Sequence, residues 1–227
     1  MTDTRLPSTG ETGEPGETGA PGGTGVTTGP TPQTRHTWRV IDIVIAAVLG
    51  VACGLIFVVW NSIGYAWFTA FDALTPGLGG LAVGIWLLGG VLGGLIIRKP
   101  GAALFVEVIA ASVSAALASQ WGIETLYSGI AQGLGAELVF ALFLYRRFTL
   151  TVAILAGMGA GVGAYILEAF LSAYFAMSLA FNIIYFSCLM ISGALLAGVV
   201  SFYLVRALAK TGALDRFAAG RELRREV

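Results

Sequence analysis

Charged side chains are scarce in this sequence. Lysine, arginine, aspartate and glutamate make up only 11% of the 227 residues, whereas hydrophobic residues make up 56% and the mean hydropathy is +0.83. A soluble domain needs far more charge to cover its surface, but a helical bundle in lipid exposes apolar side chains and confines charge to its loops. The low charge content therefore excludes an ordinary soluble domain and predicts a membrane protein.

Reactive and metal-binding side chains are also few. The two cysteines, Cys53 and Cys188, fall in apolar runs, where a reduced thiol packs as a small hydrophobe, and the single histidine, His36, lies outside these runs. No GxxxxGK[ST] phosphate loop, HExxH zinc helix or GxSxG nucleophile motif occurs. We therefore expect no disulfide, no metal site, no cofactor, no catalytic residues and no nucleic-acid partner.

The apolar residues form six runs separated by breakers. Crossing roughly 30 Å of hydrocarbon takes about 20 apolar residues in a helix, and these runs are continuous rather than alternating, which excludes a porin-type barrel. The sequence therefore predicts an all-α bundle of six transmembrane helices. Their expected bounds are 39–60, 79–97, 102–120, 126–145, 149–176 and 182–206, with 61–78 as a long external loop that folds back on the bundle.

The two ends of the chain are polar. Residues 1–36 carry glycine at every third position from Gly10 to Gly25, but six triplets are too few for a collagen helix, so a disordered tail is expected. The start lacks the basic-then-apolar layout of a cleavable signal peptide, so the first span should be retained. Residues 37–209 form the expected membrane domain, and 210–227 a basic tail that lies along the membrane, against a partner, or in solvent.

The cations indicate an orientation. With six spans, all thirteen lysines and arginines fall on one side of the membrane, and the opposite loops at 61–78, 120–125 and 176–182 contain none. Positively charged loops stay in the cytoplasm, so we expect a multi-pass protein of the cell membrane with both termini cytoplasmic.

Four acids lie inside the predicted spans, where charge is costly and a functional role is the default hypothesis. Asp42 is three residues after Arg39, and a local ion pair accounts for it. Glu107 comes early in the third span, where it either contacts a ligand or stabilises a helix N-terminus.

The other two acids have polar neighbours at helical spacing. Glu137 follows Gln132 in a glycine-rich stretch, which is typical of a ligand contact or of a hydrogen bond between helices. Glu168 lies one turn after Tyr165, and a carboxylate beside an aromatic ring suits a cationic or aminopyrimidine ligand. Aromatic residues near the outer surface form further walls or serve as interface anchors. The predicted substrate-binding residues are Trp86, Glu107, Gln132, Glu137, Tyr165 and Glu168.

Small residues recur every four positions on the first predicted helix, at Ala46, Gly50 and Gly54. Such a stripe lets another helix approach closely. The sequence leaves open whether that helix belongs to this bundle or to a partner subunit.

Several segments resemble one transporter family. The segments are "IRKPGAAL" at 97–104 followed by Glu107, "QGLGAELVF" at 132–140, "AGMGAGV" at 156–162, "ISGALLAG" at 191–198 and "TGALDRFAAGREL" after the sixth span. From about Trp38 onward the chain resembles the YkoE-type substrate-binding (S) components of energy-coupling factor (ECF) transporters. The resemblance implies a six-helix subunit that captures thiamine or its hydroxymethylpyrimidine moiety for ATP-driven import. It also implies a membrane coupling protein (T component) and two ATPase subunits as partners, with the stripe on the first helix as the docking surface.

The residues alone support a less specific conclusion, a membrane protein that binds something polar. Two alternatives stay open at this point. One is a membrane enzyme that uses Glu107, Glu137 or Glu168 as an acid or base, and the other is a structural membrane subunit without a small-molecule ligand.

Overall fold

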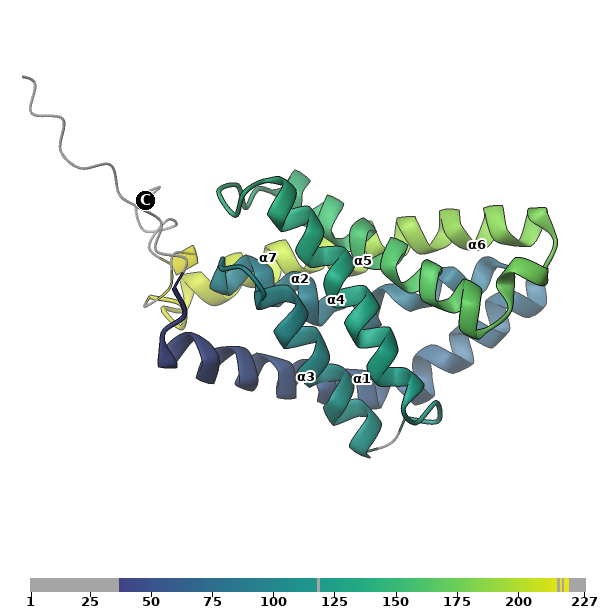
Figure 1. Cartoon of the computed structure of the whole chain (residues 1–227), viewed down its shortest axis with the longest axis horizontal. Coiled ribbons are helices and arrows are strands. Elements are labelled where there is room, and N and C mark those ends of the chain that lie inside the picture. Colours follow the sequence, from purple (N-terminus) through teal and green to yellow (C-terminus); the bar gives the residue numbers. More distant parts are fainter. Residues whose placement is uncertain (1–36, 118, 216, 218, 221–227) are drawn as a thin grey trace, which may run out of the picture. The chain divides into compact units, whose positions relative to one another are not determined.

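The chain folds as an all-helical bundle in the computed structural model, which describes residues 37–117, 119–215, 217, 219 and 220 (Figure 1). Its elements are α1 (Val40–Leu74), η1 (Leu78–Leu87), α2 (Leu88–Ile97), α3 (Ala102–Leu117), α4 (Glu124–Leu142), α5 (Leu150–Leu171), η2 (Tyr174–Ala176), α6 (Leu179–Ser192), η3 (Gly193–Val199) and α7 (Val200–Lys210). The expected disordered tail at 1–36 and half of the expected basic tail lie outside the described residues.

These elements make six helical segments, as predicted. η1 continues into α2, and α6, η3 and α7 form one run from Leu179 to Lys210. Four of the six segments are long and apolar enough to cross a bilayer, whereas α3 has only 16 residues. At 1.5 Å per residue α3 is about 24 Å long, so it is shorter than the hydrocarbon layer.

The prediction of a loop at 61–78 is wrong, because most of this stretch is helical. α1 continues without a break to Leu74, which makes it 35 residues and about 52 Å long. The polar and small residues that resembled loop signals, Asn61 and Gly64, are buried on the face of α1 that meets the bundle. The chain turns only at 75–77, where Gly77 has φ +100° and its N–H donates to the Asp72 carboxylate over 2.7 Å.

α2 is the core of the bundle. All ten of its residues are buried, and it packs against α1, α3, α4, α5, η3 and α7. Glycine makes this possible, because a Cβ atom on Gly93 would lie 2.6 Å from a methyl carbon of Val106 in α3. The helix is therefore a scaffold around which the longer helices pack.

The sixth segment is wound irregularly. Its middle part, η3, is a π-helix, and it packs against α5. Gly193 at its start lies against the backbone of Gly157, since a Cβ atom at Gly193 would be 2.6 Å from the Gly157 carbonyl oxygen. This close contact fixes α6 and α7 beside α5.

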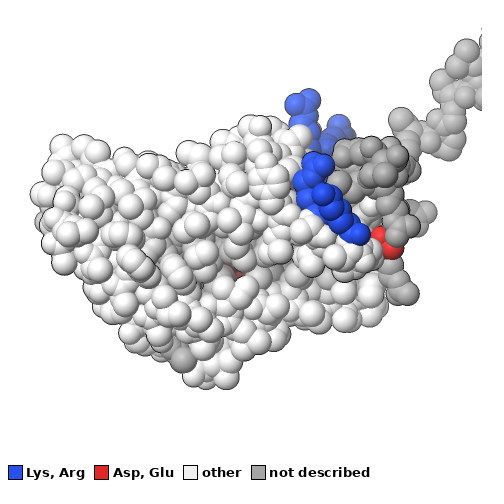
Figure 2. Space-filling model, turned by 180° about the vertical axis from the view of Figure 1, so that it is seen from behind, with Lys and Arg blue, Asp and Glu red and all other residues white. Residues whose placement is uncertain are grey.

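The described cations gather at one end of the bundle, here called the basic end (Figure 2). They are Arg39, Arg98, Lys99, Arg146, Arg147, Arg206 and Lys210. The predicted ion pair is confirmed, since Arg39 lies 3.0 Å from the Asp42 carboxylate. Lys99 also pairs with Asp42 and donates to the Thr37 carbonyl over 2.7 Å, so the start of α1 is tied to the α2–α3 turn.

Candidate functional site

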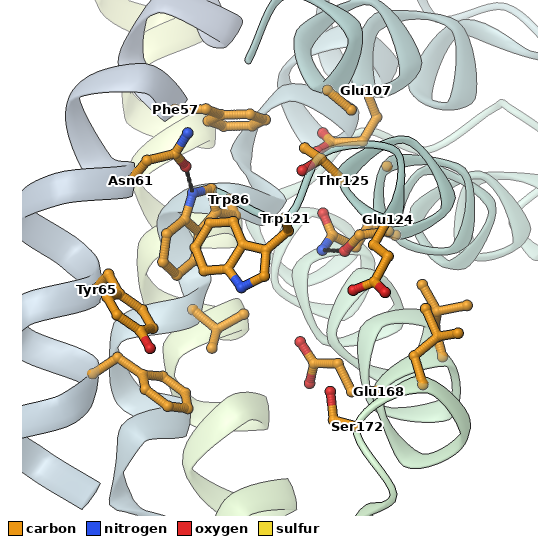
Figure 3. Close-up of a pocket in the computed structure, with 18 of the residues that line it drawn as sticks. Phe57, Asn61, Tyr65, Trp86, Glu107, Trp121, Glu124, Thr125, Glu168 and Ser172 are labelled. Carbon is orange, nitrogen blue, oxygen red and sulfur yellow. Dashed lines mark hydrogen bonds between the residues drawn. The ribbon is translucent and has the colours of Figure 1, made fainter. Parts of the chain in front are cut away.

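A cavity of about 300 Å³ lies within the bundle (Figure 3). Its walls come from α1, η1, α3, α4, α5, η2, α6 and the α3–α4 connection. Three of its lining residues are acids, Glu107, Glu124 and Glu168, and none of the described residues that line it is Lys, Arg or His. Seven are aromatic: Phe57, Tyr65, Phe68, Trp86, Trp121, Tyr174 and Tyr185. Its composition is therefore acidic and aromatic.

Glu107 lies deep in this cavity, with only 1% of its surface exposed. Its Oε2 accepts a hydrogen bond from the backbone N–H of Gly90, in the first turn of α2. Because η1 continues into α2 at this point, the hydrogen bond joins α3 to the middle of the second helical segment. The start of α2 therefore holds Glu107 in place.

Gln132 lies beside Glu107. In the orientation that satisfies both ends of its amide, its nitrogen donates to Glu107 Oε1 over 3.3 Å and to the Trp86 carbonyl over 3.0 Å, and its oxygen accepts from the Ser128 hydroxyl over 2.6 Å. Both N–H groups of the amide are thus used within the chain, so Gln132 positions the Glu107 carboxylate beside Trp86.

Asn61 fixes the ring of Trp86. The indole Nε1–H of Trp86 donates to Asn61 Oδ1 over 2.9 Å, and Asn61 Nδ2 donates to the Ser114 hydroxyl over 3.0 Å. Buried polar groups need such partners, because an unpaired one costs about 1–3 kcal/mol. This chain of bonds joins α1, η1 and α3 at the cavity wall.

Glu168 faces the cavity from α5. Its Oε2 accepts a hydrogen bond from the Tyr185 hydroxyl over 2.5 Å. The Tyr185 ring lies 5.0 Å from the Tyr174 ring and 6.4 Å from the Phe68 ring, measured between centroids. Burial, together with the nearby Glu168 carboxylate, raises the pKa of Tyr174, so this phenol stays neutral. Glu168 is thus surrounded by neutral aromatic rings.

Trp121 lies across the middle of the cavity in the close-up (Figure 3). It belongs to the short connection between α3 and α4, and its ring meets Trp86 edge to face at 5.7 Å and Tyr65 at 5.6 Å. The α3–α4 connection therefore contributes an aromatic side chain to the cavity wall beside η1 and α1.

The structure brings together four of the six predicted site residues. Trp86, Glu107, Gln132 and Glu168 line the cavity. Tyr165 is not among the lining residues, and its hydroxyl donates instead to Asn182 Oδ1 over 2.9 Å.

Glu137 is likewise not among the lining residues. Its carboxylate accepts the backbone N–H groups of Gly101, Ala103 and Leu104 at 2.6, 2.9 and 3.3 Å, and the Tyr145 hydroxyl at 2.7 Å. Burial and the hydrogen bond to Glu137 raise the pKa of Tyr145. Of the two alternatives for Glu137, the geometry matches a hydrogen bond between helices, at the start of α3.

The stripe of Ala46, Gly50 and Gly54 packs against α3 within the chain. All three residues are buried, and a Cβ atom on Gly50 or Gly54 would lie 2.6 Å from the Cβ of Ile109 or Val113 in α3. The stripe therefore forms the α1–α3 contact within this chain. Its role as a partner-docking surface stays a prediction.

Sequence reasoning missed Asn61, Tyr174 and Tyr185 as parts of the cavity wall. Asn61 was assigned to a loop, and the two tyrosines come from η2 and α6, which follow the long α5. Their only signal in the sequence was a polar or amphipathic side chain beside an apolar run, which is shared by many interface residues.

Comparisons with known proteins identify the class. Residues 41–163 match the family model described as "ABC-type cobalt transport system, permease component". A crystal structure of an S-component of an ECF transporter superposes with a TM-score of 0.78 at 36% identity, covering 84% of this chain and 95% of that one. The fold is therefore that of a membrane component of an ATP-driven importer.

The chain is also 37% identical over 195 residues to YkoE of Bacillus subtilis (strain 168), a protein named for a proposed role as an HMP/thiamine permease. The match covers 84% of this chain and 94% of that protein. The chain belongs to the YkoE family of ECF S-components. It is therefore a multi-pass membrane component of a transporter and not an enzyme, which confirms the resemblance drawn from the sequence.

Proposed function

We propose that this chain captures thiamine, or its hydroxymethylpyrimidine moiety (HMP), for import. The observation that carries the proposal is the composition of the cavity, which combines three carboxylates with seven aromatic rings and has no cation among its described lining residues. Aromatic faces and carboxylates attract organic cations, and thiamine carries a permanently cationic thiazolium ring. The cavity volume of about 300 Å³ is within the range of small-ligand sites.

The proposed binding residues are Trp86, Glu107, Gln132 and Glu168, which the sequence had already selected. Asn61, Trp121, Tyr174 and Tyr185 join them because they line the same cavity. The named role of the YkoE protein agrees with this ligand chemistry.

Calorimetric titration of the purified protein tests the proposal. Thiamine and HMP should each bind with one-to-one stoichiometry. Thiamine diphosphate should bind at least about tenfold more weakly than thiamine, since no described cation lines the cavity to pair with its phosphates. Equal or tighter binding of the diphosphate would contradict the proposal, as would a folded protein that binds neither thiamine nor HMP.

The proposed partners follow from the family. An S component imports its ligand together with a membrane coupling protein and two ATPase subunits, and the chain should co-purify with such subunits from its own cells. ATP-dependent uptake of thiamine in proteoliposomes should require all of these subunits. Uptake by this chain alone would contradict the partner assignment.

The proposed orientation places the basic end in the cytoplasm of a cell-membrane protein, because basic loops remain on that side. Lys210 is exposed at the basic end, and Leu74 is 76% exposed at the end of α1. An impermeant amine reagent should label Lys210 only in inverted vesicles, whereas an impermeant thiol reagent should label Leu74→Cys in intact cells. The reverse pattern would contradict this orientation.

A further inference from the structure

The cavity has two chemically different ends. In the close-up, Glu107 lies near one end and Glu168 near the other, with Trp86 and Trp121 between them (Figure 3). Both carboxylates face the same space, but different groups surround them. A ligand made of two unlike rings would meet a different environment at each end.

The end around Glu107 is suited to hydrogen bonding. The amides of Gln132 and Asn61 lie there with the carboxylate, and the Trp86 and Phe57 rings provide flat walls. An aminopyrimidine ring presents an amine donor and ring-nitrogen acceptors along one edge. The Glu107 carboxylate can accept hydrogen bonds from the amine, and the flat walls suit the pyrimidine ring.

The end around Glu168 is an aromatic cage, formed by Tyr65, Phe68, Tyr174 and Tyr185. The rings of Tyr65 and Phe68 are stacked at 6.2 Å, and Phe68 meets Tyr185 edge to face. Glu168 Oε2 accepts the Tyr185 hydroxyl, and no hydrogen bond to its Oε1 occurs in the described part of the chain. Rings around a carboxylate with unused acceptor capacity are suited to an organic cation.

We infer that Glu168 and the aromatic cage are the specificity determinants that select thiamine over HMP. This assignment rests on the proposed function and goes further by orienting the ligand. The thiazolium cation of thiamine occupies the cage, and the aminopyrimidine ring, which thiamine shares with HMP, lies at the Glu107 end. Neutral HMP has no group for the cage, so it gains nothing from the Glu168 charge.

The test is a matrix of calorimetric titrations with thiamine and HMP. Glu168→Gln should weaken thiamine binding by about tenfold or more and change HMP affinity by less than about twofold. Glu107→Gln should weaken the binding of both ligands by a similar factor. Glu137→Gln is the matched control, because it neutralises a glutamate that accepts its hydrogen bonds from the start of α3 and from Tyr145 rather than facing the cavity, and both affinities should stay unchanged.

Two outcomes would overturn the assignment. One is an equal loss of both ligands in Glu168→Gln, and the other is a loss of thiamine alone in Glu107→Gln. If the wild-type protein binds neither ligand, the proposed function itself fails, so the two failures are distinguishable. Should Glu168→Gln not fold, Tyr174→Leu removes one ring of the cage and answers the same question. A selective loss of thiamine in that variant supports the assignment, and an equal loss rejects it.

Discussion

Glu107 and Glu137 lie on the neighbouring helices α3 and α4, and each accepts a backbone N–H group at the start of another helix. They differ in how much hydrogen-bonding capacity their carboxylate oxygens have left for a ligand. Both Glu137 oxygens are occupied, by three N–H groups and the Tyr145 hydroxyl, whereas among the described residues Glu107 Oε1 accepts a hydrogen bond only from the Gln132 amide at the cavity wall. A carboxylate in an apolar run is thus available to a ligand only where packing leaves it unused acceptor capacity beside a cavity.

The same contrast applies to small residues. Gly50 and Gly54 lie directly against α3, and their small size serves packing within the bundle rather than ligand binding. The predictions that follow test this division between a packed region and a ligand-binding region.

The largest effect is expected in the packed region. Gly50→Leu should lower the free energy of unfolding by about 3 kcal/mol, because the new side chain must displace Ile109 of α3. Thermal unfolding in detergent measures this change, and Ala52→Leu is the matched control, since Ala52 is exposed on the same helix. Normal thermal stability combined with lost uptake in Gly50→Leu would instead favour the partner-docking interpretation.

Glu107→Leu should reduce thiamine affinity about a hundredfold, or about 2.7 kcal/mol. The substitution removes a charged acceptor and leaves the Gly90 N–H without its partner. Calorimetry on protein that still unfolds cooperatively is the measurement. Unchanged affinity in such protein would show that Glu107 only stabilises α2.

Glu137→Gln should act on stability and not on binding. One of its amide atoms would be an NH₂ donor placed against backbone N–H donors, at a cost of about 2 kcal/mol in the free energy of unfolding. Thermal unfolding and thiamine titration of the same preparation separate the two effects. A weaker ligand affinity at unchanged stability would contradict the assignment of Glu137 to the packed region.

The smallest effect is expected for Asn61→Leu. The indole N–H of Trp86 and the Ser114 hydroxyl lose their partner, so thiamine affinity should fall about fivefold, or about 1 kcal/mol. Tryptophan emission of the free protein should shift because the surroundings of Trp86 change. The control is Ser62→Leu, at the exposed neighbouring position, which should change neither thiamine affinity nor tryptophan emission. If Asn61→Leu behaves like this control, Asn61 does not position Trp86.

The sequence predicted six helical segments, the clustering of the cations and the pairing of Asp42 with Arg39, because all of these follow from local composition and spacing. It did not predict the rotation of each helix. In lipid the outer face of a helix is as apolar as the buried one, so both Glu137 and Glu168 are predicted to contact a ligand. Only the packed bundle separates Glu168 at the cavity from Glu137 at the start of α3, and only tertiary structure brings Tyr174 and Tyr185 to Glu168.

The most direct test is a titration of the purified protein with thiamine while tryptophan emission is followed. Trp86 and Trp121 line the cavity, so occupation of the cavity should change emission saturably, with one thiamine bound per chain. A folded protein whose emission stays constant at saturating thiamine, and which shows no heat of binding, would contradict the claim that this acidic, aromatic cavity holds an organic cation.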